Sequence, residues 1–333
     1  METDPGSGRD VKIILSIAAS FVVTLMVAVG LAFSQEPQVP EGGGGLDFSE
    51  QLGGSDTAPA PLQSVPARDG YAMQYRRYEG AEGAPLLVLV HGSGWHGLQF
   101  DSLAKALQGK ADVIVPDLRG HGTAPGRRGD IDYIGQFEDD LADLIDSQRR
   151  PGQAVILGGH SSGGGLVIRF AGGAYGETLD GAVLLAPYLQ HDAPTTRSAS
   201  GGWAHVALRR IIGLSILNTF RISVFNHLPV IAFNMPQDVL DGPLGDTATT
   251  RYSYRLNTGF APRRDYLADV AALPPFLLLA GSRDEAFVAE LYGPTMADAT
   301  EKGRYLVLNG ATHLDIVNDG RTRAEIEAFL DGY

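Results

Sequence analysis

The amino-acid sequence predicts an α/β fold: a doubly wound, mostly parallel sheet that carries a helical cap insertion and follows an N-terminal transmembrane helix. Three observations predict it. From Tyr71 onward, short apolar runs of strand length alternate with segments of helical apolar spacing, as in strands joined by crossover helices. Residues 188–262 interrupt this alternation, which indicates an insertion. An uncharged aliphatic stretch at residues 13–33 predicts the membrane helix.

Continuous apolar runs are the predicted strands of the sheet. Each run is apolar throughout rather than alternating with polar residues, which is the pattern of parallel strands buried on both faces. The runs lie at residues 85–90, 113–115, 154–157, 182–185, 276–280 and 305–308.

Helical segments separate these runs. Their apolar residues recur three or four positions apart, so each predicted helix has one apolar face that can cover the sheet. The segments lie at residues 100–107, 133–148, 164–171, 286–296 and 321–330.

Composition and charge bound the class of protein. With 333 residues, 44% of them apolar and 20% charged, the chain is long enough for one large domain with appendages. The formal net charge of −13 argues against a nucleic-acid partner, because phosphate binding needs a basic face. The absence of cysteine from the sequence excludes disulfides, thiolate metal sites and a cysteine nucleophile.

The stretch at residues 13–33 has two interpretations. As an uncleaved anchor it would place residues 1–12 in the cytoplasm, because Arg9 and Lys12 precede it and no basic residue follows until Arg68. As a signal sequence it would be cleaved near Ser34, and the protein would be secreted or periplasmic. We expect an anchor, because the apolar run exceeds the roughly 7 to 15 residues usual in signal sequences.

Two further regions complete the predicted organisation. Residues 34–68, rich in Gly, Pro, Ala and acidic residues, are a predicted flexible linker, and residues 69–333 form the α/β domain. The cap, residues 188–262, holds arginines but no acidic residue between Asp192 and Asp238. Either these arginines lie at the surface of ordinary cap helices, or they form a face that meets lipid or anionic head groups. They are Arg197, Arg209, Arg210 and Arg221.

A candidate nucleophile lies in the motif Gly159-His160-Ser161-Ser162-Gly163, which matches the pattern G-x-S-x-G. The pattern alone is weak in a chain with 43 glycines. Its context is specific, because a strand-like run precedes it and a helix-like run follows, giving the strand-turn-helix that exposes a serine hydroxyl. The glycines leave room for a sharp, strained turn. Ser161 is therefore the predicted nucleophile.

Two backbone N–H groups are the predicted oxyanion hole. One belongs to Ser162, the residue after the nucleophile. The other belongs to Ser93 in His91-Gly92-Ser93-Gly94, which follows the first predicted parallel strand. The alternative for this second segment is an ordinary turn.

A serine hydroxyl needs a general base and an acid that orients it, in the chain order Ser, Asp, His. Asp284 follows the run at residues 276–280, and His313 follows the run at residues 305–308. Both are expected at the carboxyl ends of strands, where the sites of such sheets form. Glu285 and Asp192 are the reserve acids. Because no residue cluster has metal-ligand spacing, we expect no metal or cofactor.

Together these motifs resemble the α/β-hydrolase superfamily over residues 71–333. The resemblance also includes Asp117-Leu118-Arg119-Gly120-His121-Gly122 and Gly281-Ser282-Arg283-Asp284, and it is nearest to the branch with monoacylglycerol lipases, lysophospholipases and serine aminopeptidases. The predicted function is hydrolysis of lipid-like or medium-chain acyl esters through an acyl-enzyme, with a membrane as partner. The alternatives are an aminopeptidase or amidase using the same residues, and a membrane-tethered binding module without activity. Oligomeric state is not predicted.

Overall fold

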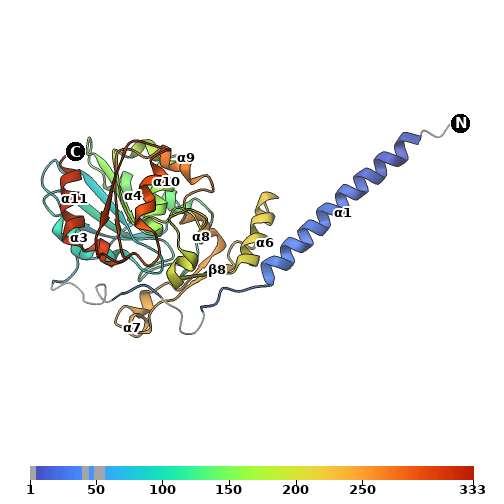
Figure 1. Ribbon diagram of the computed structural model, residues 1–333, viewed down its shortest axis with the longest axis horizontal. Coiled ribbons are helices and arrows are strands. Elements are labelled where there is room, and N and C mark those ends of the chain that lie inside the picture. The colour runs from blue at the N-terminus through green and yellow to red at the C-terminus, as the bar shows by residue number, and fades with distance from the viewer. Residues whose placement is uncertain (1–4, 40–44, 49–56) are drawn as a thin grey trace.

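The computed structural model describes residues 5–39, 45–48 and 57–333. Within these residues an eight-stranded sheet has the order β1-β2-β4-β3-β5-β6-β10-β11 (Figure 1). β1 pairs antiparallel with β2, and β2 with β4, whereas the other neighbours run parallel. The predicted fold class and the six predicted parallel strands are confirmed. The strands are β1 (Gln63–Pro66), β2 (Ala72–Tyr78), β3 (Leu86–Val90), β4 (Asp112–Asp117), β5 (Val155–His160), β6 (Gly181–Leu185), β10 (Phe276–Gly281) and β11 (Gly303–Leu308).

Apolar side chains cover both faces of the sheet. Along β3 successive residues point to opposite faces, so Val88 packs into one core and Leu89 into the other. Helices α4 (Gln136–Gln148) and α5 (Ser162–Ala171) contribute to the first core, and α3 (Asp101–Ala106) and α11 (Gly320–Leu330) to the second. Each fully buried Val, Leu or Ile contributes about 1.5–3 kcal/mol of transfer free energy, so this sheet is a rigid platform for the loops at its ends.

The predicted helix at residues 286–296 is wrong in its first half. Helix α10 covers only Tyr292–Met296, after a 3₁₀ turn at Ala289–Leu291. The Asp284 carboxylate accepts hydrogen bonds from the backbone N–H groups of Ala286 and Phe287, and Phe287 forms a β-bridge with Thr196. These contacts use backbone groups that a helix would need.

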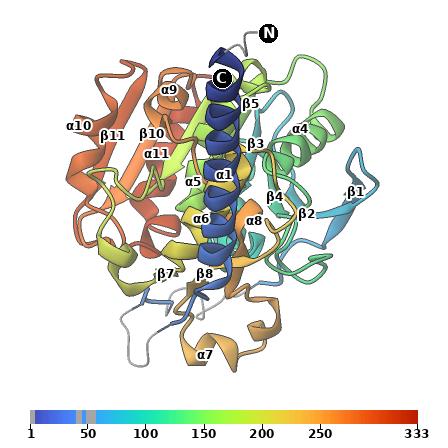
Figure 2. The ribbon, with the colours of Figure 1, turned by 90° about the vertical axis from the view of Figure 1, so that its right-hand side faces the viewer.

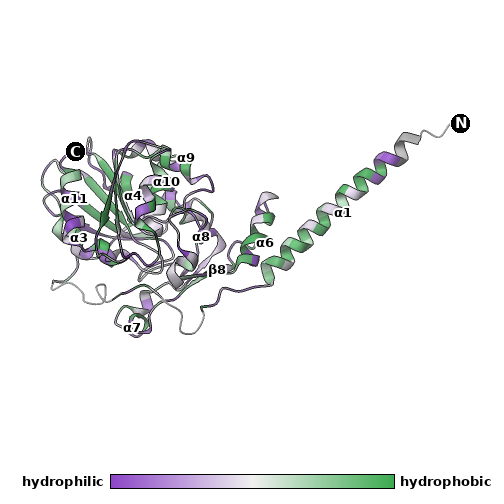
Figure 3. Cartoon of the chain, in the orientation of Figure 1, coloured by the Kyte–Doolittle hydropathy of each residue, from purple (hydrophilic) through white to green (hydrophobic). Residues whose placement is uncertain are grey.

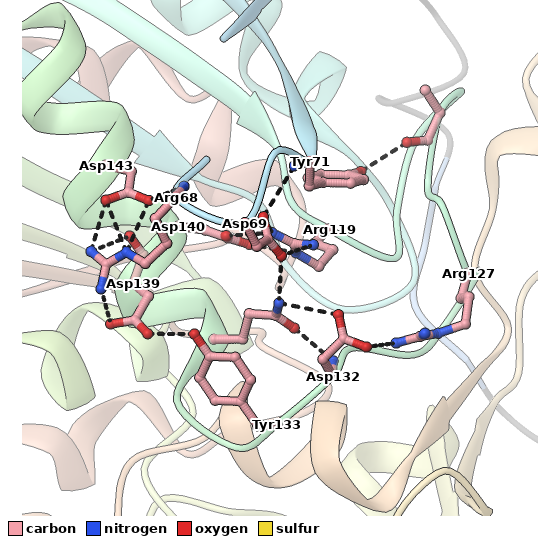
Figure 4. A network of polar contacts seen from close by, with 12 residues as sticks. Arg68, Asp69, Tyr71, Arg119, Arg127, Asp132, Tyr133, Asp139, Asp140 and Asp143 are labelled. Carbon is pink, nitrogen blue, oxygen red and sulfur yellow. Dashed lines mark hydrogen bonds and ion pairs between the residues drawn. The ribbon is translucent and has the colours of Figure 1, made fainter. Parts of the chain in front are cut away.

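The prediction of a flexible linker at residues 34–68 is wrong near its C-terminal end. Residues 40–44 and 49–56 of this segment lie outside the described residues. Gln63–Pro66 form β1, and Figure 4 shows the polar network that follows it. Arg68 forms ion pairs with Asp139 and Asp143, at 2.9 and 2.7 Å. The buried Arg119 guanidinium lies 2.9 Å from Asp69 and 2.8 Å from Asp140. Ion pairs therefore hold Arg68 and Asp69 close to α4. The composition of residues 34–68 does not indicate these contacts.

The cap, residues 188–262, is not wholly helical as predicted. It contains α6 (Leu208–Thr219), α7 (Gln237–Leu240) and α8 (Tyr254–Gly259), but also an antiparallel sheet of β7 (Ala204–Val206), β8 (Pro229–Phe233) and β9 (Arg251–Ser253). Helix α9 (Tyr266–Ala271) follows it. β8 pairs with two short edge strands that are distant in sequence. This pairing depends on tertiary structure, so the sequence pattern of the cap does not indicate it.

Helix α1 (Pro5–Phe33) projects from the domain and is apolar over most of its length (Figures 1 and 3). Arg9–Phe33 is long and apolar enough to cross a membrane, by length and composition. The C-terminal part of α1 packs on α6 (Figure 2), and a Cβ at Gly213 would lie 2.4 Å from the Ala28 carbonyl oxygen. A residue without a side chain is therefore required for this close approach.

Two cap arginines bind the end of α1. The buried Arg210 donates hydrogen bonds to the carbonyl oxygens of Ala32 and Pro229, both at 2.8 Å. Arg209 donates to the Ser34 carbonyl at 3.2 Å. Carbonyls at a helix C-terminus lack intrahelical partners, so these contacts stabilise the end of α1. The hypothesis that Arg210 belongs to a face meeting head groups is therefore wrong.

Candidate active site

Ser161 lies at a strained turn between β5 and α5. Its φ is 55° and its ψ −121°, a conformation rare for a residue with a side chain. The flanking glycines make the turn possible, because a Cβ at Gly159 would lie 2.4 Å from Gly163, and one at Gly163 would lie 2.2 Å from the Val90 carbonyl oxygen. The local sequence thus produces the strand-turn-helix that the motif predicts.

Ser161, His313 and Asp284 form a chain of hydrogen bonds at the carboxyl ends of β5, β11 and β10. The Ser161 Oγ lies 3.0 Å from His313 Nε2. The His313 Nδ1–H donates to Asp284 Oδ2 at 2.8 Å. Both His313 and Asp284 are buried, so bulk water does not compete for these contacts. Such a chain can move a proton from the hydroxyl to the ring while the carboxylate orients the imidazole.

The geometry distinguishes Asp284 from the two reserve acids. The second oxygen of Asp284 accepts N–H hydrogen bonds from Ala286 and Phe287, at 2.8 and 2.7 Å, which hold the carboxylate toward the ring. Glu285 accepts instead from the His313 backbone N–H at 2.9 Å, so it steadies the loop. The Asp192 side chain is 75% exposed and does not reach the ring.

The predicted oxyanion donors lie together beside the nucleophile. The hydroxyl oxygens of Ser93 and Ser162 are 2.5 Å apart, which brings the loop after β3 to the start of α5. Within the part of the chain that the structure describes, neither backbone N–H donates a hydrogen bond to another group. Both N–H groups therefore stay available for a substrate oxygen.

Sequence reasoning missed residues that hold this site. The Gly92 N–H donates to the side-chain oxygen Oε1 of Gln99 at 2.9 Å, and Nε2–H of the same amide donates to His160 Nδ1 at 2.7 Å. His160 Nε2–H donates to the His313 carbonyl at 2.9 Å. Burial and the neighbouring His313 hold the pKa of His160 well below its ordinary value, so its ring is neutral. Neither Gln99 nor His160 has a sequence signal that indicates this role.

The cap also contacts the oxyanion loop. The hydroxyl of the buried Tyr252 in β9 accepts a hydrogen bond from the Gly94 N–H at 2.6 Å and lies 2.7 Å from His121 Nε2. Burial lowers the pKa of His121 well below its usual value, so Nε2 of the neutral ring can accept a hydrogen bond from the Tyr252 hydroxyl. Only the folded cap brings this tyrosine to the loop.

Two spaces of different size flank Ser161. The recess, about 10 Å³ in volume, is the smaller of the two. Its lining includes the polar residues Gln99, His160 and His313 and the apolar residues Leu46 and Phe48. The cap cavity, about 630 Å³, extends from Ser161 to α6.

The lining of the cap cavity combines apolar side chains with basic ones. Aromatic and aliphatic residues of the cap supply much of the wall, among them Ile211, Ile231 and Phe233. Arginines contribute the charge, and this lining contains no Asp or Glu: Arg169, Arg197, Arg263 and Arg264. Among the described residues, no group of three or more His, Cys, Asp or Glu could hold a metal ion.

The fold and the serine-histidine-aspartate arrangement define an enzyme of the α/β-hydrolase class. The model of the serine aminopeptidase S33 family matches residues 82–314, and the chain belongs to this family. The human monoglyceride lipase is 28% identical over 272 residues, which cover 77% of this chain and 80% of that protein. The predicted resemblance to this branch is confirmed.

Solved structures share the fold. A soluble variant of the Saccharomyces cerevisiae monoglyceride lipase superposes with a TM-score of 0.63 and 18% identity, over 83% of this chain and 96% of that one. A membrane phospholipase A described as a bacterial virulence factor superposes with a TM-score of 0.56 and 18% identity, over 96% of each chain.

Proposed function

We propose that the protein is a membrane-anchored serine hydrolase that cleaves carboxylic esters of lipid-like or medium-chain acids through an acyl-enzyme. The observation that carries this proposal is the hydrogen-bonded chain Ser161–His313–Asp284 opening into a large cavity without acidic residues. The human relative is named as a monoglyceride lipase, which supports an ester substrate.

The reaction proceeds in two halves. His313 takes the Ser161 proton as the serine oxygen attacks the ester carbonyl, and the N–H groups of Ser93 and Ser162 stabilise the negative oxygen that forms. The bond to the alkoxy oxygen then breaks, and His313 gives its proton to the departing alcohol. Water then attacks the acyl-serine while His313 takes its proton. His313 returns this proton to the Ser161 oxygen as the carboxylic acid leaves. Asp284 holds the imidazole in the correct tautomer throughout.

The cap cavity is the proposed acyl site. Its volume of about 630 Å³ lies within the range of roughly 300–1,000 Å³ that encloses small-molecule ligands. Its apolar wall gains about 0.8 kcal/mol for each methylene group that it removes from water. A medium or long acyl chain can therefore supply most of the binding energy.

The family name raises an aminopeptidase as the alternative. A substrate with a free amine carries a positive charge, which needs a carboxylate or carbonyl acceptor near the scissile bond. The cavity instead presents arginine side chains and no carboxylate. Arg264 lies exposed at this lining. Arg169 and Arg263 are ion-paired with Glu138, which does not line the cavity, so a substrate amine would find no carboxylate there and the ester is favoured.

Helix α1 acts in this proposal as an uncleaved anchor, with residues 1–12 in the cytoplasm and residues 69–333 on the other side. Contacts with the cap argue against cleavage near Ser34, because cleavage would remove the Ala32 carbonyl from the buried Arg210 and the packing partner of Gly213. The buried Arg210 Nε–H would then lack its acceptor, and a buried donor without a partner is costly.

Contacts at the other end of α6 support a position of the cap beside the lipid. Phe220, after α6, packs against Phe21 with ring centroids 5.0 Å apart, whereas Arg210, near its start, contacts Ala32. Helix α6 thus runs antiparallel along the C-terminal half of α1. If α1 spans the membrane, the exposed Leu208 and Ile212 of α6 face the same apolar layer.

One experiment tests both halves of the proposal. Membranes from cells that express the full chain are washed with alkaline carbonate and assayed with p-nitrophenyl esters of graded chain length and with aminoacyl p-nitroanilides. We expect ester hydrolysis to stay with the washed membranes, to exceed amide cleavage at least 100-fold, and to disappear in Ser161→Ala. Faster amide cleavage would favour the aminopeptidase, and activity released into the wash would contradict the anchor.

A further inference from the structure

We infer that Leu46 and Phe48, which lie between α1 and β1, close the leaving-group side of the active site and determine which alcohols the enzyme can release. This inference rests on the proposed ester hydrolysis. It also gives the predicted linker a role at the site, because both side chains are buried, with 7% and 5% of their surface exposed.

The position of His313 identifies the leaving-group side. His313 Nε2 must reach the alkoxy oxygen to protonate it when the carbon–oxygen bond breaks. His313 lines the recess together with Ser161, whereas the cap cavity is lined by Ser161, Ser93 and Ser162 without His313. The acyl chain therefore extends into the cap cavity, and the alcohol lies in the recess.

Aromatic packing holds Phe48 at this place. Its ring lies edge-on to Trp95, with centroids 6.0 Å apart, and 5.7 Å from the ring of Trp203. Trp95 follows the oxyanion loop and Trp203 precedes β7 of the cap, so Phe48 joins the N-terminal segment to both. Aromatic pairs of this geometry contribute about 0.5–1.5 kcal/mol beyond the area they bury.

The backbone before Phe48 is also in close contact with the cap. A Cβ at Gly45 would lie 3.2 Å from the carbonyl oxygen of Asn234, in the loop after β8. The segment therefore lies directly against this loop, and a side chain at residue 45 would require the loop to shift. Gly45 and Phe48, before and after Leu46 in the sequence, both contact the cap, and the Leu46 side chain between them lines the recess.

The size of the recess gives the consequence for specificity. A volume of about 10 Å³ is close to the roughly 10–15 Å³ that one water molecule needs. The recess can therefore hold the water that hydrolyses the acyl-enzyme, whereas a bulky alcohol must displace Phe48 or Leu46. Esters of small alcohols avoid this cost.

The test compares two esters of one acid, the methyl and the benzyl ester of decanoic acid, with the full chain in detergent micelles. Phe48→Ala should raise the ratio of benzyl to methyl kcat/KM at least tenfold, because the recess gains the volume of a ring. Phe48→Trp should lower the ratio below that of the unmodified protein. The preference among methyl esters of different acids should change little, because Phe48 itself does not line the cap cavity.

Phe220→Ala is the matched control, since Phe220 is 42% exposed and lines neither space. Its ratio should equal that of the unmodified protein. A ratio unchanged by Phe48→Ala, in a variant that unfolds at the normal temperature, would overturn the inference. If Phe48→Ala does not fold, Phe48→Leu and Leu46→Ala carry the same expectation in smaller steps. Failure of the unmodified protein to hydrolyse either ester would instead overturn the proposed function.

Discussion

The recess and the cap cavity meet at Ser161 but are built in different ways. Loops at the ends of sheet strands supply the polar wall of the recess, and hydrogen bonds fix its members, as between His160 and the His313 carbonyl. The cap supplies much of the wall of the cavity, mainly through packing of side chains such as Ile231 and Phe233. The difference separates two tasks: the hydrogen-bonded side holds the reacting groups in place, and the packed side selects the acyl chain.

Changes at the hydrogen-bonded side should have the largest effects. His313→Ala should lower kcat by about 10⁴-fold or more, and Asp284→Asn by somewhat less, because such groups act as a unit. KM should change little, since the cap cavity still binds the acyl chain. Steady-state kinetics with a p-nitrophenyl ester measure both constants.

Asp192→Asn is the matched control for the acid, because its exposed side chain does not reach the ring. We expect its kcat to stay within about twofold of the normal value, because its ion-pair partner at 3.9 Å is the likewise exposed His191. A large loss in this variant, with Asp284→Asn active, would show that the acid is misassigned.

Changes at the packed side should be smaller and depend on chain length. Ile211→Trp places a larger side chain at the α6 end of the cap cavity and should exclude the last methylene groups of a long acyl chain. At about 0.8 kcal/mol per methylene group, the loss of two or three lowers kcat/KM for a C16 ester about 10- to 50-fold. The C4 ester should be hydrolysed at the normal rate.

Ile212→Trp gives the comparison for this change on the same helix. Ile212 is 43% exposed and does not line the cavity, so its replacement should leave the chain-length profile as it was. Equal profiles for Ile211→Trp and the unmodified protein would mean that the acyl chain does not reach α6.

The sequence predicts the hydrogen-bonded side better than the packed side, for a physical reason. The turn at Ser161 needs glycines within a few residues, and a parallel sheet brings the loops of Asp284 and His313 to the same edge, so local pattern and chain order suffice. Phe48 and Tyr252 reach the site only through contacts distant in sequence. Neither has a local pattern that indicates its role.

Contacts of two arginines explain two further errors. Arg68 lies in the predicted linker, yet it pairs with Asp139 and Asp143 of α4. Arg210 belongs to the predicted basic cap segment, yet it is buried against the end of α1. Such partners are chosen by the folded arrangement, and composition alone therefore predicts a linker and a basic face where the structure has fixed contacts.

The proposed reaction depends most directly on Ser161 as the nucleophile. A fluorophosphonate probe, which reacts with activated serines, should label the full chain, and peptide mapping should find the label on Ser161. Ser161→Ala should abolish labelling, and Ser162→Ala should retain it, because Ser162 takes part through its backbone N–H. Labelling that persists in Ser161→Ala, or that is lost only in Ser162→Ala, would contradict the account.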